Sequence, residues 1–354
     1  MVRLDSMGDV LVCGPAIRAV AAAADHLTLL TGPSGQGAGR LLPGVDEVLV
    51  WACPWILNPA PSVSPADFAE LVERLAGKRL DEAVILTSFH QSALPTALLL
   101  RLAGVGRIVA SSEDYPGSLL DLRLPVAGDG PEPERMLATV RAAGFELPLG
   151  DQGKLAVRLP PQPPAGHLAD PESPYLVVHP GTTAAARAYP GPLWAETVRQ
   201  LGVAGWQVLV TGSKDERELT AGIVATARAG LPATVAAQVL DLAGVLELAE
   251  LAGVLAGAEA VLVANTGPAH LAAAVGTPVV SLFSPVVPAA RWAPYGVAVA
   301  LLGDQGAACR GSRQTRCPVP GHPCLSGVEP ATVVATVEQL IRHQTIAKTL
   351  AVTG

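Results

Sequence analysis

Apolar runs of strand length alternate with amphipathic stretches along most of the chain. In the first half, short apolar runs are separated by segments whose apolar residues recur every three or four positions. We expect strands at residues 27–31, 45–50, 83–87 and 107–110. We expect helices at about residues 10–24, 65–76, 92–102 and 132–143. This alternation predicts parallel sheets with helices on both faces.

A proline-rich run at residues 160–164 interrupts the pattern, because Pro-Pro-Gln-Pro-Pro joins neither a sheet nor a helix. The alternation then restarts, with strands expected at residues 175–179, 206–211, 235–240, 261–264 and 279–283. Helices are expected at residues 192–201, 214–229, 246–255 and 330–343. The sequence therefore predicts an N-terminal domain at 1–159, a linker at 160–172, a C-terminal domain at 173–328, and a final helix and tail at 329–354. The two doubly wound α/β domains are expected to face a central cleft.

The composition and charge of the chain limit the kinds of molecule that it is expected to bind. Half of the 354 residues are hydrophobic, but no stretch has the ~20 uninterrupted apolar residues of a membrane span. The chain shows no secretory signal, so we expect a cytoplasmic protein without an integral membrane segment. Residues 1–165 hold 13 Lys and Arg against 18 Asp and Glu, a net charge of −5, and the remainder holds 11 against 13, a net charge of −2. Neither half offers a basic surface for nucleic acid, and the first half favours a neutral or cationic partner.

The five cysteines are odd in number, which argues against a disulfide framework. Three of them, Cys309, Cys317 and Cys324, lie close together with His322 between them and suggest a zinc site. Their spacings of seven and six intervening residues match no CxxC-type signature, so we expect no bound metal and leave this cluster open.

A polar turn follows the expected strand at 261–264. Asn265 and Thr266 are cap-type residues, Pro268 suits the first position of a helix, and the segment from Gly267 to His270 opens that helix. Free backbone N–H groups and the positive end of a helix dipole at a strand's carboxyl end suit a phosphate group. The structural alternative is an ordinary turn whose cap only ends a helix.

A second turn of this kind lies at the N-terminus, where Gly8 and Asp9 begin a helix after a brief strand. Gly8 permits close approach of the backbone to a ligand. A carboxylate at Asp9 can act as a general base toward a bound hydroxyl group. The alternative is that Asp9 only caps its helix.

Two further loops follow expected strands. The first contains Thr182, Thr183 and Arg187, whose hydroxyl and guanidinium groups can bind a diphosphate. The second opens a helix, and an acidic residue there can accept hydrogen bonds from ribose hydroxyls or cap the helix. Its candidate residues are Gly212, Ser213, Asp215 and Glu216. No GxGxxG, Walker or GxSxG motif is present, which argues against hydride transfer, P-loop phosphoryl transfer and serine hydrolysis.

Taken in order, Ser-Met-Gly-Asp at 6–9, His-Pro-Gly-Thr-Thr at 179–183 and Asn-Thr-Gly-Pro-Ala-His at 265–270 resemble glycosyltransferase family 9. Further matches lie at 44–48, 241–244 and 281–285, so the resemblance covers nearly the whole chain. It implies a GT-B fold, with two Rossmann-like domains that bind the acceptor and the nucleotide sugar respectively. It also implies transfer with inversion at the anomeric carbon, without a metal ion.

The resemblance also implies roles for individual residues. Asp9 matches the family's catalytic base, and Thr182 and Thr183 match hydroxyls that bind the diphosphate. Arg187 stands where heptosyltransferases commonly have a Lys that neutralises the phosphates. Thr266, Gly267 and His270 match the phosphate-binding turn and the helix behind it. Asn265 stands where several heptosyltransferases have an Asp that contacts the sugar, which leaves the donor sugar open.

We therefore predict an inverting glycosyltransferase that uses a nucleotide-diphosphate sugar, ADP-heptose first among the candidates, as a co-substrate and needs no cofactor. The acidic first half argues against an anionic lipid. We accordingly expect a soluble acceptor, such as an amino-sugar or aminocyclitol intermediate of a natural product. A lipopolysaccharide core heptosyltransferase is the first alternative and a nucleotide-sugar epimerase is the second.

Overall fold

The computed structural model describes residues 1–126, 128–159 and 173–353. The chain divides into two compact units, unit 1 at Met1–Arg158 and unit 2 at Leu159–Gly354. The linker predicted at 160–172 lies outside the described residues. Among the residues that are described, no helix combines the length and the apolar character needed to cross a membrane.

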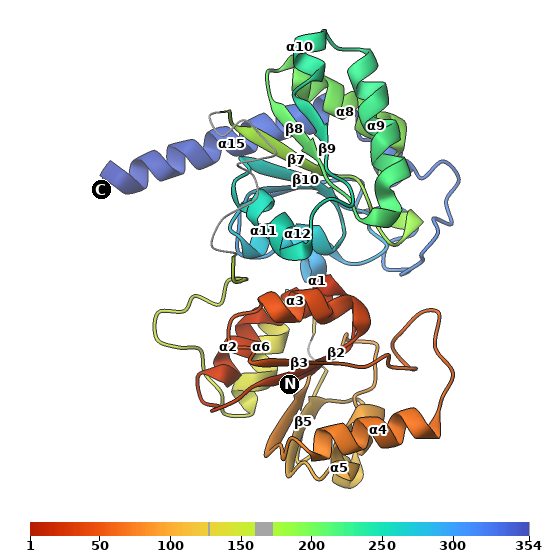
Figure 1. Cartoon of the computed structure of the whole chain (residues 1–354), viewed down its shortest axis with the longest axis vertical. Coiled ribbons are helices and arrows are strands. Elements are labelled where there is room, and N and C mark those ends of the chain that lie inside the picture. The colour runs from red at the N-terminus through yellow and green to blue at the C-terminus, as the bar shows by residue number, and fades with distance from the viewer. Residues whose placement is uncertain (127, 160–172, 354) are drawn as a thin grey trace. The chain divides into compact units, whose positions relative to one another are not determined.

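Unit 1 is built on a parallel sheet of six strands in the order β3-β2-β1-β4-β5-β6. The strands are β1 (Val2–Arg3), β2 (Thr28–Thr31), β3 (Glu47–Val50), β4 (Glu82–Ile85), β5 (Arg107–Ser111) and β6 (Leu122–Leu124). The helices are α1 (Met7–Leu11), α2 (Gly14–Ala21), α3 (Gln36–Leu41), α4 (Pro65–Ala76), α5 (Leu94–Leu102) and α6 (Glu132–Ala142). In Figure 1, α2, α3 and α6 cover one face of the sheet, and α4 and α5 cover the other.

Unit 2 repeats this plan with a parallel sheet in the order β12-β11-β10-β7-β8-β9. The strands are β7 (Tyr175–His179), β8 (Gln207–Val210), β9 (Val239–Asp241), β10 (Ala260–Ala264), β11 (Val279–Leu282) and β12 (Val299–Leu302). The α-helices are α8 (Gly191–Val203), α9 (Arg217–Ala229), α10 (Ala233–Ala236), α11 (Leu248–Ala256), α12 (Gly267–Ala274), α13 (Ala289–Trp292), α14 (Pro323–Ser326) and α15 (Pro330–Thr353). Two 3₁₀ turns lie near the site, η3 (Ala185–Arg187) and η4 (Lys214–Glu216).

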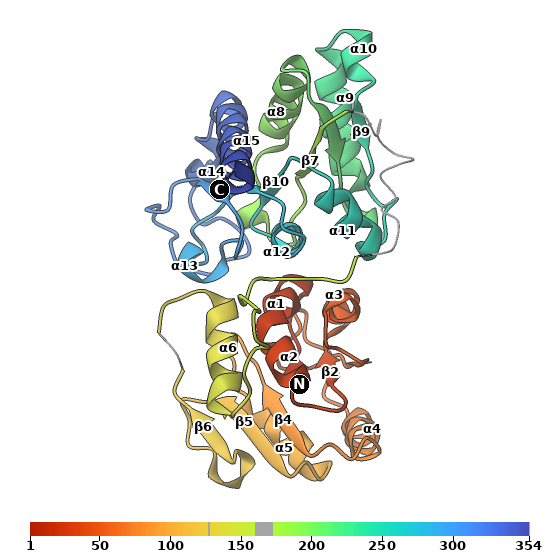
Figure 2. The same ribbon diagram turned by 90° about the vertical axis from the view of Figure 1, so that its left-hand side faces the viewer.

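Helices cover both faces of the second sheet as well. Figures 1 and 2 show α8, α9 and α15 on one face and α11 and α12 on the other. All five residues of β7 and all five of β10 are buried. Central parallel strands that are covered on both faces carry continuous apolar runs, which is the pattern the sequence shows there.

Two predicted elements are wrong in part, and two strands were not predicted. The apolar run at 235–240 is not one strand, because Pro232 starts the short helix α10 and only Val239–Asp241 pairs with the sheet. The helix predicted at 10–24 is divided into α1 and α2, because Pro15 has no N–H group to continue the first helix and instead suits the start of a second. The edge strands β6 and β12 were missed, since their side chains are mostly half-exposed and show no buried pattern.

Candidate active site

The two central strands, β1 and β7, lie at the topological switch points of their sheets. β1 pairs with β2 on one side and β4 on the other, and β7 pairs with β10 and β8. In doubly wound sheets ligands bind outside the carboxyl ends of the strands at such points. The loops that the sequence analysis singled out at 5–9 and 180–187 directly follow these two strands.

Asp9 lies in the first turn of α1, which begins two residues earlier than expected, at Met7. Its Oδ2 accepts hydrogen bonds from the backbone N–H of Ser6, at 3.2 Å, and from the Ser6 hydroxyl. This is a capping box, so the structural role considered for Asp9 is present. The carboxylate also has a second partner, because Arg3 Nη2 lies 3.0 Å from Oδ1. Gly8, beside it in α1, is buried.

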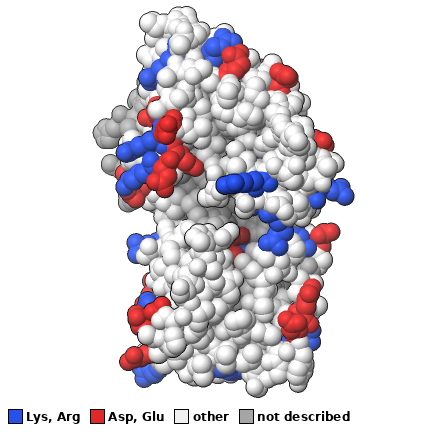
Figure 3. Space-filling view, turned by 90° about the vertical axis from the view of Figure 1, so that its right-hand side faces the viewer, with Lys and Arg blue, Asp and Glu red and all other residues white. Residues whose placement is uncertain are grey.

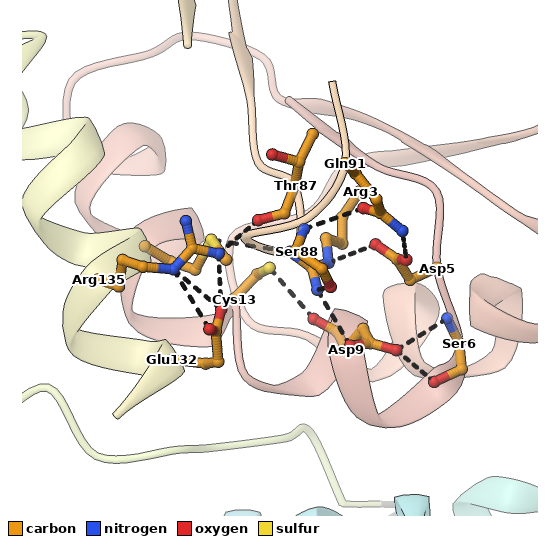
Figure 4. Close-up of polar contacts among 11 residues, drawn as sticks. Arg3, Asp5, Ser6, Asp9, Cys13, Thr87, Ser88, Gln91, Glu132 and Arg135 are labelled. Carbon is orange, nitrogen blue, oxygen red and sulfur yellow. Dashed lines mark hydrogen bonds and ion pairs between the residues drawn. The ribbon is translucent and has the colours of Figure 1, made fainter. Parts of the chain in front are cut away.

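Arg3 is a site residue that the sequence analysis missed. Its side chain is fully buried and, besides Asp9, contacts Asp5 (Nε to Oδ2, 3.0 Å) and donates to Ser88 Oγ at 2.9 Å (Figure 4). Burial lowers the pKa of the guanidinium, but the negative charges of Asp5 and Asp9 outweigh that effect and raise it. Arg3 therefore stays charged. The signal in the sequence was a single cation inside an apolar strand, where a buried charge requires partners.

The second partner of Arg3, Asp5, lies in a polar cluster at the same sheet edge. Gln91, in the loop after β4, donates a hydrogen bond to Asp5 Oδ1. Burial raises the pKa of Asp5, and the charge of Asp9 adds to this, while Arg3 opposes both effects. Glu132 and Arg135 of α6 form a second buried ion pair of 2.7 Å, and Arg135 also donates to the Thr87 carbonyl. The sequence analysis selected none of the side chains in these contacts, namely Asp5, Gln91, Glu132 and Arg135, because the contacts join segments that are distant in sequence.

In unit 2, three of the predicted segments follow three adjacent strands. The segment 180–187 follows β7, 211–216 follows β8 and 265–270 follows β10, and these strands are neighbours in the order β10-β7-β8. Because all three strands are parallel, the segments share one edge of the sheet. The tertiary structure thus brings together residues that are up to 88 positions apart in the sequence, from Thr182 to His270.

The β7 segment presents its polar groups in a compact turn. Thr182 is half-buried and its Oγ1 accepts a hydrogen bond from the Ala184 N–H at 3.4 Å. Thr183 is exposed, and Arg187 ends the 3₁₀ turn η3 with a half-buried side chain. The two hydroxyls and the guanidinium therefore lie on one short loop at the switch point.

Glu216 connects the β7 and β8 segments. Its Oε2 accepts from the Ser213 N–H at 2.7 Å and lies 3.8 Å from His179 Nε2. A Cβ atom on Gly181 would stand 2.0 Å from Glu216 Oε1, so only glycine leaves room for this carboxylate. Burial lowers the pKa of His179, although the charge of Glu216 opposes it. His179 belongs to the His-Pro-Gly-Thr-Thr motif, but the sequence analysis did not select it.

The other predicted residues of the β8 segment differ in exposure. Ser213 and Asp215 are exposed, and Gly212 is half-buried, with Thr220, Glu216 and Ala243 all packed around the position a Cβ would take. Glu216 completes a capping box with Ser213. The helix-capping role considered for this residue is therefore present in the structure.

Asn265 ends the β10 strand region and precedes α12. Its side chain is only 4% exposed, and within the described part of the chain its Nδ2 has no hydrogen-bond partner. Thr266 is the N-cap of α12, without a side-chain cap hydrogen bond, and Gly267 and Pro268 form the first turn. His270 is buried on this helix. A buried amide without a partner is costly, and a polar ligand at this edge would satisfy it.

The cysteine cluster lies in a long connection after β12. Cys309 and Cys324 are buried and Cys317 is half-buried, and Cys309 packs with Ala186 and Val286. The Nε2 of His322 lies 3.1 Å from the Ala186 carbonyl oxygen. Among all described residues, no group of three or more His, Cys, Asp or Glu side chains is arranged to hold a metal ion.

Comparison with solved structures shows which fold the chain has. The E. coli ADP-heptose LPS heptosyltransferase II has a TM-score of 0.74 and 20% identity, and the match covers 97% of this chain and 98% of that one. The E. coli heptosyltransferase WaaC with ADP-2-deoxy-2-fluoro heptose has a TM-score of 0.68 and 22% identity, with 96% and 98% covered. A family 9 glycosyltransferase from Veillonella parvula has a TM-score of 0.78 and 15% identity, with 97% and 96% covered. The fold is therefore GT-B, as predicted.

Sequence comparison then gives the family. The model of glycosyltransferase family 9 (heptosyltransferase) matches residues 69–320. "Lipopolysaccharide heptosyltransferase 1" of Pseudomonas aeruginosa is 31% identical over 324 residues, which are 86% of this chain and 83% of the relative. The chain belongs to glycosyltransferase family 9 and is a glycosyltransferase. The name of this relative favours the lipopolysaccharide alternative over the soluble amino-sugar or aminocyclitol acceptor that was our first expectation.

Proposed function

We propose that this protein is an inverting, metal-independent heptosyltransferase that moves heptose from ADP-heptose to a hydroxyl group of the lipopolysaccharide core. The name of the Pseudomonas aeruginosa relative supports this acceptor. The observation that carries the proposal is the shared sheet edge of the three segments after β7, β8 and β10, with the unsatisfied Asn265 amide beside the first turn of α12. We assign the reaction to the cytoplasm, because its donor is a nucleotide derivative.

In the proposed reaction the acceptor oxygen forms a bond to the anomeric carbon of the heptose. The bond from that carbon to the β-phosphate oxygen breaks, and ADP leaves with the electron pair. Asp9 takes the proton of the acceptor hydroxyl. Attack opposite to the leaving group inverts the anomeric configuration.

The leaving diphosphate needs positive charge and hydrogen-bond donors. Arg187, the hydroxyls of Thr182 and Thr183 and the first-turn amides of α12 supply them in this proposal. Glu216 accepts hydrogen bonds from the ribose hydroxyls. Arg187 thus takes the part that a divalent cation takes in metal-dependent transferases.

An assay of the purified protein with ADP-heptose tests this function. With lipopolysaccharide from a mutant that lacks core heptose, we expect release of ADP and a heptosylated product, unchanged by EDTA. Conversion of ADP-heptose into an isomer without acceptor would instead indicate an epimerase. Transfer to an aminocyclitol but not to lipopolysaccharide would restore the soluble acceptor, and loss of turnover in EDTA would contradict metal independence.

Replacement of Asn265 by Ala tests the donor site separately. The Nδ2 group has no hydrogen-bond partner to lose within the described residues, so the loss in the free energy of unfolding should come from the removed packing and the Oδ1 group, on the order of 1–2 kcal/mol. The affinity for ADP-heptose, measured by calorimetry, should fall about tenfold or more. A variant that loses stability but keeps its donor affinity would show that Asn265 serves only the fold.

A further inference from the structure

Arg3 is fully buried in β1 and is shared by two carboxylates of unit 1 (Figure 4). Its Nε lies 3.0 Å from Asp5 Oδ2, and its Nη2 lies 3.0 Å from Asp9 Oδ1. One ionised carboxylate neutralises one guanidinium, so the second gives the trio of Arg3, Asp5 and Asp9 a net charge of −1. A net charge that is largely removed from water is costly. The pairing of a buried arginine therefore accounts for one of the two aspartates, and the other requires a further reason.

Asp5 faces a donor at each of its two oxygens. Gln91 Nε2 donates to Oδ1, and the orientation of this amide is fixed because Gln91 Oε1 accepts from the Ser88 N–H at 2.9 Å. Arg3 faces the other oxygen. Burial raises the pKa of Asp5, and Arg3 and Gln91 act in the opposite direction. A proton on either oxygen would point at a donor, so this geometry favours the ionised carboxylate.

Asp9 is the more accessible of the two carboxylates, with 18% of its side chain exposed against 11% for Asp5. Its Oδ1 faces Arg3, and its Oδ2 accepts a hydrogen bond from the Ser6 N–H. An opposite charge at this distance favours the ionised form of a carboxyl group and makes it a weaker base. Arg3 alone would thus orient Asp9 but weaken it as a base. A second carboxylate on the same guanidinium opposes that weakening.

Neighbouring elements of unit 1 bring further titratable groups close to this trio, namely Cys13, His90, Glu132 and Arg135. Glu132 and Arg135 form an ion pair of their own, at 2.7 Å. Burial raises the pKa of the Cys13 thiol to about 12, so the thiol is uncharged at neutral pH. His90 is exposed to solvent. Charged side chains on the face shown in Figure 3 form small groups at the surface, where water and salt screen them. Within unit 1, Asp5 is thus the charge placed to offset Arg3.

We propose that Asp5 is a positioning residue of the transfer reaction: held by Gln91, it anchors the Arg3 guanidinium and offsets its charge, so that Arg3 orients Asp9 without weakening it as a base. This rests on the proposed function, in which the proton of the acceptor hydroxyl passes to Asp9. Asp5 itself takes no proton from the acceptor. The structural alternative is that Asp5 only completes the pairing of a buried arginine.

The test measures the titration of individual carboxyl groups in the full chain. Aspartate labelled with ¹³C gives NMR signals of the side-chain carboxyl groups, and each signal is assigned through its bonds to the backbone. The test variant is Asp5→Asn, which keeps the size of the side chain and removes its charge. The matched control is Asp81→Asn, an exposed residue before β4, at the opposite end of the strand from Gln91. The pH profile of kcat, measured with ADP-heptose and heptose-deficient lipopolysaccharide, is the second readout.

We expect Asp9 to titrate at least about one pH unit lower in Asp5→Asn than in the wild type, because a like charge has been removed. The acid limb of the kcat profile should move in the same direction by the same amount. On the plateau kcat should fall about three- to tenfold, because Asp9 has become a weaker base, with the KM for ADP-heptose within about twofold. Asp81→Asn should change none of these quantities.

Two results would overturn the proposal in favour of the structural alternative. The first is an unchanged titration of Asp9 in an Asp5→Asn variant that has lost stability. The second is a wild-type Asp5 that carries a proton at pH 7, because a neutral group offsets no charge.

A further arm needs only the wild type. Two carboxyl groups that share Arg3 should titrate as a coupled pair, so each NMR signal should show a second step at the midpoint of the other. Independent single-step curves would contradict the proposal even if Asp5→Asn does not fold. The NMR titration also needs no acceptor. If the wild type transfers heptose to neither acceptor, the proposed function is wrong, and the titration still decides whether Asp5 sets the charge state of Asp9.

Discussion

Arg3 and Asp9 form an ion pair of 3.0 Å in which the guanidinium is completely buried and the carboxylate keeps 18% of its side-chain surface exposed. One partner is thus fixed inside the sheet and the other is presented at its edge. Because Arg3 also binds Asp5 and Ser88, it has no freedom to move with Asp9. The pair holds one oxygen of the candidate base while the Ser6 cap holds the other.

Replacement of Asp9 by Asn tests the candidate base. The amide keeps the size of the side chain but cannot take a proton, so we expect kcat to fall about 10²–10⁴-fold. The affinity for ADP should stay within about twofold, because unit 2 carries the proposed nucleotide contacts. Steady-state kinetics and calorimetry measure the two quantities. Asp25→Asn, on an exposed site of the same unit, is the control, and near-full transfer by Asp9→Asn would show that Asp9 only caps α1.

Replacement of Arg3 by Met should destabilise unit 1. It leaves Asp5 and Asp9 without their buried counter-charge, and breaking one side of a buried ion pair costs about 3–5 kcal/mol. Urea unfolding monitored by circular dichroism measures this loss. Arg3→Lys keeps the positive charge but lacks the branched guanidinium group that reaches all three partners. It should therefore recover part of the stability. If Arg3→Lys restores stability and the pH profile of kcat still shifts, Arg3 positions Asp9 and is not only structural.

Gly181→Ala should displace the Glu216 carboxylate, because the added Cβ would stand 2.0 Å from its Oε1. The protein should still fold, since the obstructed atoms are the end of a flexible side chain. The ADP affinity should fall about 10-fold, because the displaced carboxylate loses one hydrogen bond to the ligand and a bond to a charged group has about this effect. Gly222→Ala is the matched control, because nothing lies near its Cβ position in α9, and it should gain up to about 1 kcal/mol. Unchanged ADP affinity in Gly181→Ala would leave Glu216 as a helix cap.

His179 predicts a dependence of stability on pH. Burial depresses its pKa below the ordinary value of 6.5, so the folded state keeps the neutral ring while the unfolded chain binds a proton. The contribution of the neutral His179 ring to the free energy of unfolding is complete above pH 6.5. It is lost as the pH falls from there through the depressed pKa of the folded state. Between these values the loss should reach up to about 1.4 kcal/mol per pH unit. Thermal unfolding from about pH 7.5 to 5 measures it, and His179→Gln should flatten this part of the curve. Equal slopes in both proteins would mean that Glu216 keeps the ring protonated.

The sequence alone determined the fold class and the position of most loops at the site. Continuous apolar runs such as 260–264 identify central parallel strands, because burial on both faces leaves no polar positions. Cap residues after those runs locate the turns at Asp9, Thr182 and Asn265. Both signals are local, since each depends on residues within one element.

Only the tertiary structure decided which side chains meet. Arg3 ends β1, whereas Ser88 and Gln91 lie in the loop after β4. These two strands are adjacent in the sheet but about 80 residues apart in the chain, and no local pattern encodes that pairing. The attachment of the connection after β12 to the turn at Ala186 likewise joins residues 129 positions apart, from 186 to 315. Sequence periodicity gives the faces and ends of each element. The order of the strands, set by packing of the whole sheet, decides which ends become neighbours.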